Sequence, residues 1–217
     1  MGTRDLGKGG SALKSMGAPS NVTPLQLDIT QDLSIDAAFE HIKSTYGKLD
    51  ILINNAGTAG RDIGVTPATG ALPPGVPLRE VYEHVYRVNL ISAGVLTEKM
   101  VPLLEKSALP KIVFISSVLG SLNVLHDGAK EGKGLVPLPW YSISKAAVNH
   151  FCMWYARRYP TWKVNACCPG LVSMGLNRYE RNEENDPKFG AINVCRLVME
   201  GEEGGSGAFS DRFQTLP

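Results

Sequence analysis

The sequence has almost no net charge. It holds 22 lysine and arginine residues against 21 aspartate and glutamate residues in 217, a formal net charge of +1. Such a chain has no strong field to attract nucleic acid or an anionic membrane surface, so we expect small-molecule or protein partners. Long apolar runs are also absent, and the first residues are polar and glycine-rich. We therefore expect no transmembrane helix, no signal peptide and a cytoplasmic location.

Cysteine is scarce as well. Cys152, Cys167, Cys168 and Cys195 form no CxxC pair and lie in apolar stretches. This pattern predicts reduced thiols used as small core residues, in a reducing compartment, with no disulfide framework. We single out no metal ligands.

Strand and helix patterns alternate along the chain from Pro24. This alternation predicts an α/β fold, a doubly wound, mostly parallel Rossmann-like sheet with helices on both faces and its chemistry at the carboxyl ends of the strands. The length suits a single domain, residues 1–217. The expected strands are 25–29, 50–54 (fully buried), 111–116, 162–167 and 207–210, and the expected helices are 34–46, about 78–99, 141–158 and one beginning near Asp186.

The glycines near the start raise the question of a phosphate-binding loop. Such a loop needs a buried strand before it and a helix N-terminus after it. Only six residues precede Gly7–Gly10, and two of them are charged. We therefore predict a solvated loop here, followed by no more than one helical turn before Gly17.

The sharpest chemical signal is YSISK. Tyr141 and Lys145 lie four residues apart, so they share one face of the expected helix. A phenol is a poor acid or base at neutral pH, and a nearby ammonium would lower its pKa and let it exchange a proton with a carbonyl or hydroxyl oxygen. On its own, this spacing usually marks only an ordinary half-exposed helix face.

Three further signals fall near strand ends or inside the long helix. Ser116 and Ser117 follow a buried strand, where a hydroxyl could bind a substrate oxygen or simply begin a turn. Asn89 lies within a helix, where an amide is unfavourable unless it binds a specific partner, so it is a site residue or a helix-packing amide. Residues 54–57 (NNAG) follow another strand, as a ligand-binding turn or a plain one.

The order of these motifs, from NNAG through Asn89 and Ser117 to Tyr141 and Lys145, resembles the short-chain dehydrogenase/reductase family, in particular its carbonyl-reductase-like members. The resemblance covers nearly the whole chain. It implies that Tyr141 is the general acid/base, that Lys145 lowers its pKa and binds ribose, that Ser117 orients the substrate, and that Asn89 holds a proton-relay water.

The resemblance also implies an NADP(H)-dependent oxidoreductase that interconverts a carbonyl and an alcohol, the hydride chemistry belonging to the cofactor. Arg4 would meet the 2′-phosphate, Asp28 and Ile29 the adenine, and Asn55, Ala56 and Gly57 the cofactor-side turn. Pro169, Gly170 and Val172 would form the nicotinamide-side loop, with Tyr141 and Lys145 also touching the cofactor.

Three departures from the family pattern stand out. The loop 117–139 is expanded and is expected to lie over the substrate. Met174 stands where members usually place a Thr, with Ser173 beside it. The first strand, the glycine-rich turn and the first helix, which in the family precede the TRD motif, are expected to be missing, which would weaken cofactor binding and expose a strand edge.

Two other functions remain open at this stage. One is a cofactor-independent acid/base enzyme (an isomerase, dehydratase or cyclase) that uses Tyr141, Lys145 and Ser117. The other is a non-catalytic scaffold that assembles through the exposed sheet edge. Family members commonly form homo-oligomers through the helices that contain Asn89 and Tyr141. The loops 58–77, 117–139 and 171–186 suggest a bulky, largely apolar substrate.

Overall fold

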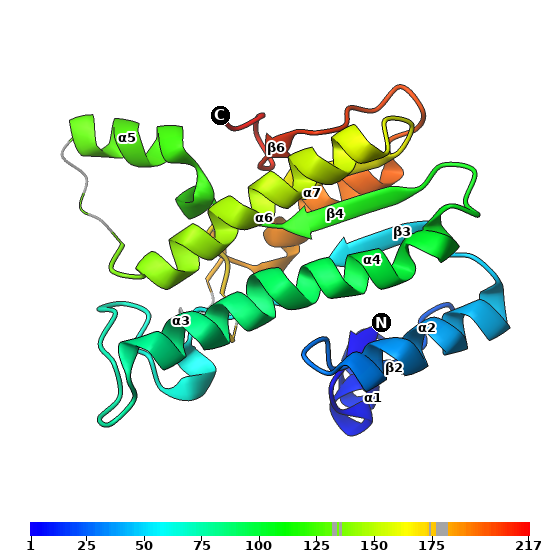
Figure 1. The fold of residues 1–217 in the computed structure, drawn as a ribbon, viewed down its shortest axis with the longest axis horizontal. Helices are drawn as coiled ribbons and strands as arrows, with labels where there is room; N and C mark the ends of the chain where they lie inside the picture. The colour runs from blue at the N-terminus through cyan, green and yellow to red at the C-terminus, as the bar shows by residue number, and fades with distance from the viewer. Residues whose placement is uncertain (132–133, 135, 174, 177–181) are drawn as a thin grey trace.

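The computed structural model describes the chain except for residues 132–133, 135, 174 and 177–181 (Figure 1). Met174 therefore lies outside the described residues. Among the described residues no helix is long and apolar enough to cross a membrane.

The main sheet has four parallel strands in the order β3-β4-β5-β6. They are β3 (Ile51–Asn54), β4 (Lys111–Ile115), β5 (Lys163–Cys167) and β6 (Phe209–Ser210). A second, two-stranded parallel sheet joins β1 (Gly2–Thr3) to β2 (Leu25–Gln26). Every strand pair within these two sheets is parallel, which confirms the predicted sheet type.

Helices pack on both faces of the main sheet. Ile112 and Phe114 of β4 join one core with helices α2 (Asp32–Tyr46), α4 (Ser92–Leu104) and α6 (Pro139–Arg158). Val113, between them in β4, points to the other face and packs with α7 (Pro187–Met199). This alternation along one strand is what a sheet covered on both sides requires, and the fold is doubly wound as predicted.

Strand β3 departs from the expectation of a fully buried strand. Within the sheet it pairs only with β4, and Ile53 is 42% exposed. Asn54 is the buried member of this strand. Ile53 lines a cavity at the carboxyl ends of the strands, which leaves its side chain open to solvent and explains the difference.

The glycine-rich start is a helix and not the predicted loop. Helix α1 (Leu6–Ser15) includes Gly7–Gly10, and the Asp5 carboxylate caps it by accepting a hydrogen bond from Lys8 N at 3.0 Å. Gly9 packs closely on β1, because a Cβ there would lie 2.7 Å from Thr3 Cγ2. Gly9 was predicted to lie in a loop, but its lack of a side chain allows close packing between the helix and the strand.

Other boundaries differ in informative ways. Helix α2 begins at Asp32, and Ser34 does not cap it but accepts a hydrogen bond from Asp28 N at 2.9 Å. Gly47 ends this helix with a left-handed φ of 73°, as predicted. The two long loops contain short helices that the sequence pattern missed, namely η1 (Arg61–Ile63), η3 (Val118–Gly120) and α5 (Leu122–Lys130).

The long helix around Asn89 forms without a break but changes its pitch. Helix α3 (Leu78–Tyr86) runs into a π-helical segment, η2 (Arg87–Ile91), and then into α4, which includes Pro102. Single π-helical turns interrupt the regular hydrogen-bond ladder and frequently mark functional positions. Asn89 lies in the middle of this segment.

Candidate active site

A cavity of about 830 Å³ lies at the carboxyl ends of β3, β4 and β5. All three long loops contribute to it. Its lining includes most of the residues singled out in the sequence, namely Asn55, Ala56, Gly57, Ser117, Tyr141, Lys145, Pro169, Gly170 and Val172. Residues far apart in the chain therefore meet where a parallel sheet is expected to place its chemistry.

Tyr141 and Lys145 lie one turn apart in α6, as their spacing predicts. The Lys145 ammonium is 5.6 Å from the centre of the Tyr141 ring. Its Nζ also donates a 2.7 Å hydrogen bond to the carbonyl oxygen of Ile115, at the end of β4. This bond fixes the end of a long side chain that is only 4% exposed.

Burial dominates the acid–base properties of this pair. Desolvation raises the pKa of Tyr141 to about 12, against a hydrogen bond with Ser117 that lowers it. Desolvation lowers the pKa of Lys145 to about 8, and the nearby Cys168 opposes that change. The Tyr141 pKa therefore moves opposite to the direction that the Tyr/Lys spacing predicts, because loss of water outweighs the hydrogen bond with Ser117.

The two serines after β4 have different environments. Ser117 caps η3 by accepting a 3.3 Å hydrogen bond from Leu119 N, and it acts to lower the pKa of the Tyr141 phenol. Ser116 is buried, and its Oγ donates to the Lys145 carbonyl oxygen at 3.2 Å. Ser117 thus faces the cavity beside the phenol, whereas Ser116 ties β4 to α6.

Asn89 lies behind the cavity lining, beside the turn that contains Gly57. Its Oδ1 accepts from Thr58 N at 2.8 Å, and its Nδ2 donates to Thr58 O and to Ser144 Oγ, each at 2.9 Å. A Cβ on Gly57 would lie 3.4 Å from Asn89 Oδ1 and 3.5 Å from Lys145 Nζ. The amide and the ammonium therefore approach the same glycine from two sides.

Arg4, Asp28 and Ile29 are not part of the cavity lining. The Asp28 carboxylate accepts hydrogen bonds from Thr30 N and Thr30 Oγ1. These bonds, more than the charges of Arg4 and Arg87, hold the pKa of Asp28 below its usual value. Arg87, in the π-helical segment, is thus a second cation near Asp28 that the sequence analysis missed.

Several cavity residues gave no sequence signal. Cys168 accepts hydrogen bonds from Val118 N and Gly170 N at 3.3 and 3.4 Å, and burial raises its pKa. Ala191, Val194 and Cys195 bring α7 to the cavity wall. Cys195 is exposed, contrary to the expectation that every cysteine is a core residue. Because α7 reaches the cavity only through folding, local sequence pattern could not reveal it.

The cavity suits one half of a nicotinamide dinucleotide better than the other. Tyr141, Lys145 and the backbone of residues 169–172 surround a site of suitable polarity for the nicotinamide and its ribose. Few groups in the cavity can bind the pyrophosphate, because Lys145 is the one charged residue in the described lining. The N-terminus of α1, the helix nearest the chain start, is already capped by the Asp5 carboxylate. The nicotinamide half therefore fits better than the phosphates do.

Comparisons with known proteins agree with this geometry. A family model described as short chain dehydrogenase matches residues 3–185. The chain is 34% identical to the short-chain dehydrogenase/reductase ATR10 of Stachybotrys chlorohalonatus, over 97% of this chain and 76% of that protein. It is 30% identical to the (+)-neomenthol dehydrogenase of Arabidopsis thaliana, over 87% and 77% of the two chains. The structure of salutaridine reductase from Papaver somniferum superposes with a TM-score of 0.76 at 28% identity, over 96% of this chain and 89% of that one.

Proposed function

The chain belongs to the short-chain dehydrogenase family, and we propose that it is an NADP(H)-dependent enzyme that reduces a carbonyl or oxidises an alcohol on a bulky, largely apolar substrate. The observation that carries this proposal is one cavity in which Ser117, Tyr141 and Lys145 meet. Two relatives are named for the compounds neomenthol and salutaridine, which supports a small organic substrate.

The side chains suit the proton step of such a reaction. The Tyr141 phenol, with a pKa of about 12, is protonated at neutral pH and can donate its proton to a carbonyl oxygen. The Lys145 ammonium, fixed on Ile115 O, stabilises the phenolate that remains. Ser117 would hydrogen-bond the same substrate oxygen. The bound cofactor would supply the hydride.

The choice of NADP over NAD rests on two cations. Arg4 follows β1, and both Arg4 and Arg87 act on the Asp28 carboxyl. A guanidinium group suits a phosphate monoester, which arginine binds in a bidentate manner. The Arg4→Ala variant should therefore weaken binding of NADPH far more than binding of NADH.

The test of the proposed function is a calorimetric titration of the purified protein with NADPH. Binding in the micromolar to millimolar range, together with NADPH oxidation in the presence of a ketone or quinone, supports the proposal. Failure to bind at millimolar NADPH would overturn it.

A cofactor-independent acid/base enzyme is the second candidate, and the few charges in the cavity lining favour it. Such an enzyme would turn over a substrate in nucleotide-free protein, and the Tyr141→Phe variant would lose that turnover. The titration above separates the two candidates, because the second one needs no NADPH binding.

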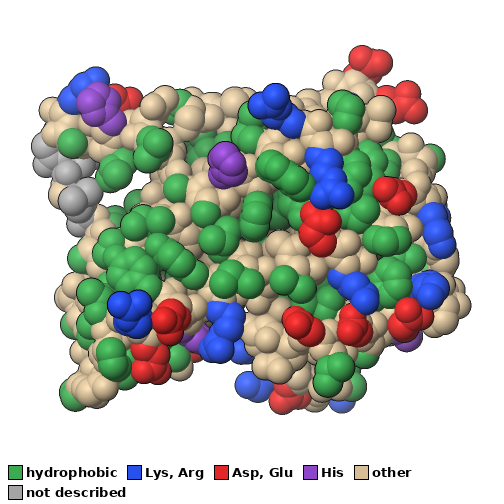
Figure 2. Space-filling model, in the orientation of Figure 1, with side chains coloured by type: hydrophobic (Ala, Val, Ile, Leu, Met, Phe, Trp, Pro, Cys, Tyr) green, Lys and Arg blue, Asp and Glu red, His purple; other side chains and the backbone are tan. Residues whose placement is uncertain are grey.

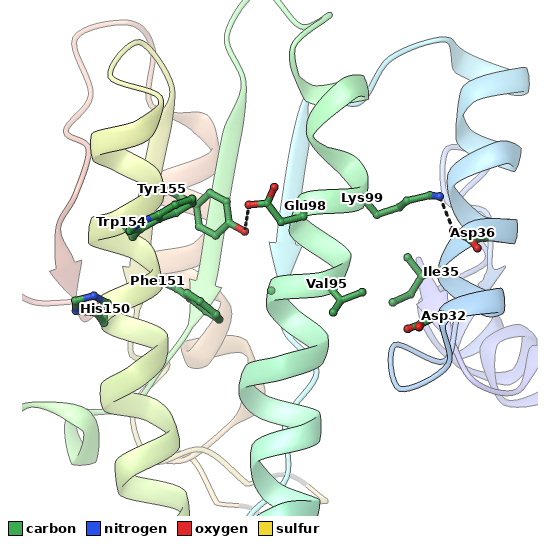
Figure 3. A pocket seen from close by; sticks show the side chains of 11 residues that line it. Asp32, Ile35, Asp36, Val95, Glu98, Lys99, His150, Phe151, Trp154 and Tyr155 are labelled. Atoms are coloured by element: carbon green, nitrogen blue, oxygen red, sulfur yellow. Dashed lines mark hydrogen bonds and ion pairs between the residues drawn. The ribbon is translucent and has the colours of Figure 1, made fainter.

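We further infer a cytoplasmic homo-oligomer that assembles through α4 and α6. A groove of about 860 Å³ crosses α2, α4 and α6 on the outer face of these helices (Figure 3). Val95 of α4 and Trp154 of α6 line it, and both are exposed. Hydrophobic side chains gather along this face between scattered charges (Figure 2). Exposed apolar surface on two neighbouring helices suits burial against a second copy of the chain.

A further inference from the structure

A chain of hydrogen bonds connects the surface of the molecule to the turn of residues 57–60, which lies beside Asn89. It begins at His84 of α3, whose Nε2 lies 2.8 Å from Asp62 Oδ2. The other carboxylate oxygen, Asp62 Oδ1, accepts a hydrogen bond from the Thr58 hydroxyl. The same hydroxyl oxygen accepts from Gly60 N at 3.0 Å. Neither Asp62 nor His84 lines the cavity described above.

Thr58 is held from two sides. Its backbone N–H and C=O both bond the Asn89 amide, while its hydroxyl bonds Asp62. Asn89 and His84 belong to one long helix, five positions apart. The turn is thus fastened to this helix twice, once through the Thr58 backbone and once through its side chain by way of Asp62.

A third contact fastens the same turn to α6. The indole Nε1 of Trp140, the residue before Tyr141, donates a 3.1 Å hydrogen bond to Ala59 O. Trp140 is buried and packs edge-on against Tyr82 of α3. The turn is therefore hydrogen-bonded both to the long helix and to the helix that carries the phenol.

The charge state of Asp62 suits this holding role. Burial alone would raise the pKa of Asp62, but the hydrogen bonds from Thr58 and His84 outweigh it, so the pKa is lower than usual. An ionised carboxylate accepts hydrogen bonds only, so His84 Nε2 must carry the proton between them. Charge-assisted hydrogen bonds of this kind are shorter and stronger than neutral ones.

We propose that Asp62 and His84 form a positioning pair that holds the Thr58 turn, and with it Gly57 and Asn89, against Lys145. The pair does not pass protons to the cavity, because its connection to Asn89 runs through the backbone amide of Thr58. Its effect on turnover rests on the proposed function, whereas its effect on the turn does not.

The first experiment measures amide hydrogen exchange of Thr58 and Gly60, whose N–H groups make the two bonds at stake. In the Asp62→Ala variant we expect both amides to exchange at least tenfold faster. Asp62→Asn keeps an acceptor for Thr58 and a group able to bond His84 Nε2, so it should retain most of the protection.

Asp50→Ala is the matched control. Asp50 also accepts from a hydroxyl, Ser107 Oγ at 2.6 Å, and from a cation, Lys48 Nζ at 2.9 Å, but it precedes β3 at the far end of the strand. This variant should leave exchange at Thr58 and Gly60 unchanged. Equal exchange in wild type and Asp62→Ala would overturn the proposal, as would equal acceleration in Asp50→Ala.

The second experiment measures turnover of NADPH with 9,10-phenanthrenequinone as the probe. In Asp62→Ala and His84→Ala we expect kcat to fall about tenfold, with the KM for the quinone within twofold of wild type, and Asp62→Asn to recover most of the loss. A rise in KM at constant kcat would contradict positioning. If the wild-type protein neither binds NADPH nor turns over the quinone, the proposed function fails, and the exchange experiment still decides whether the pair holds the turn.

Discussion

At the scale of single residues, the cavity changes the chemistry of the groups placed in it. Tyr141 and Lys145 are ordinary side chains four positions apart, yet burial moves both pKa values toward the neutral forms. Spacing along a helix indicates which groups meet, but not how much water remains around them. The identity of the pair could be predicted from the sequence, whereas the direction of the Tyr141 pKa could not.

The phenol is the residue whose loss should matter most to the proposed reaction. Tyr141→Phe keeps the ring and removes the only proton that the side chain can donate. We expect kcat to fall by about 10²–10⁴-fold, the usual contribution of a positioned general acid. Steady-state kinetics would measure it, with NADPH affinity by calorimetry as the control. A variant that keeps a tenth of the activity would show that another group supplies the proton.

The burial of Lys145 predicts that the stability of the folded protein depends on pH. Its pKa is about 8 in the folded chain and 10.5 in the unfolded one, so between these values the unfolded state binds more protons and stability rises with pH. Relative to Lys145→Met, wild type should gain on the order of 2 kcal/mol between about pH 7.5 and 10. Urea unfolding at a series of pH values measures this difference. A constant difference would mean that the lysine keeps its ordinary pKa when folded.

At the scale of elements, a tight contact between the short helix η3 and helix α6 determines where the residues of the candidate active site lie. Gly120 ends η3 directly against the backbone of α6, because a Cβ there would lie 2.6 Å from the Lys145 carbonyl carbon and 2.7 Å from Ala146 N. Backbone atoms cannot move aside as the end of a side chain can. The sequence shows a glycine after Ser117 but not the helix that passes beside it.

Gly120→Ala should therefore separate η3 from α6. We expect a loss of about 1–3 kcal/mol in the free energy of unfolding, as for overpacking, together with a fall in kcat as Ser117 moves away from Tyr141. Denaturant unfolding and kinetics on the same preparation would measure both effects. Gly10→Ala is the control, since a Cβ there meets open space in a helix and should stabilise by about 0.5–1 kcal/mol. Equal stability of both variants would argue against the close contact.

At the scale of the whole molecule, a feature could be predicted from the sequence when neighbouring residues cause it, and not when contacts between distant segments cause it. The parallel sheet follows from the alternating strand and helix patterns, and the family comparison confirms the fold. That Ser117 and Tyr141 belong to one site was implied only by the resemblance to the family. The open edge of β3, helix α5 and the contribution of α7 to the cavity depend on which segments lie side by side. Patterns within ten or twenty residues carry no information on those contacts.

The outer face of α4 and α6 gives the prediction that belongs to this scale. If two copies of the chain meet there, Trp154→Glu replaces an exposed apolar ring with a carboxylate that would lose water inside the interface, and it should turn the oligomer into a monomer. Light scattering coupled to size-exclusion chromatography measures the mass directly. Leu33→Glu is the control, because Leu33 is also exposed but does not line the groove. A wild-type protein that elutes as a monomer, or an oligomer that survives Trp154→Glu, would mean that this face has a different use, and that the groove between the helices is not where the copies meet.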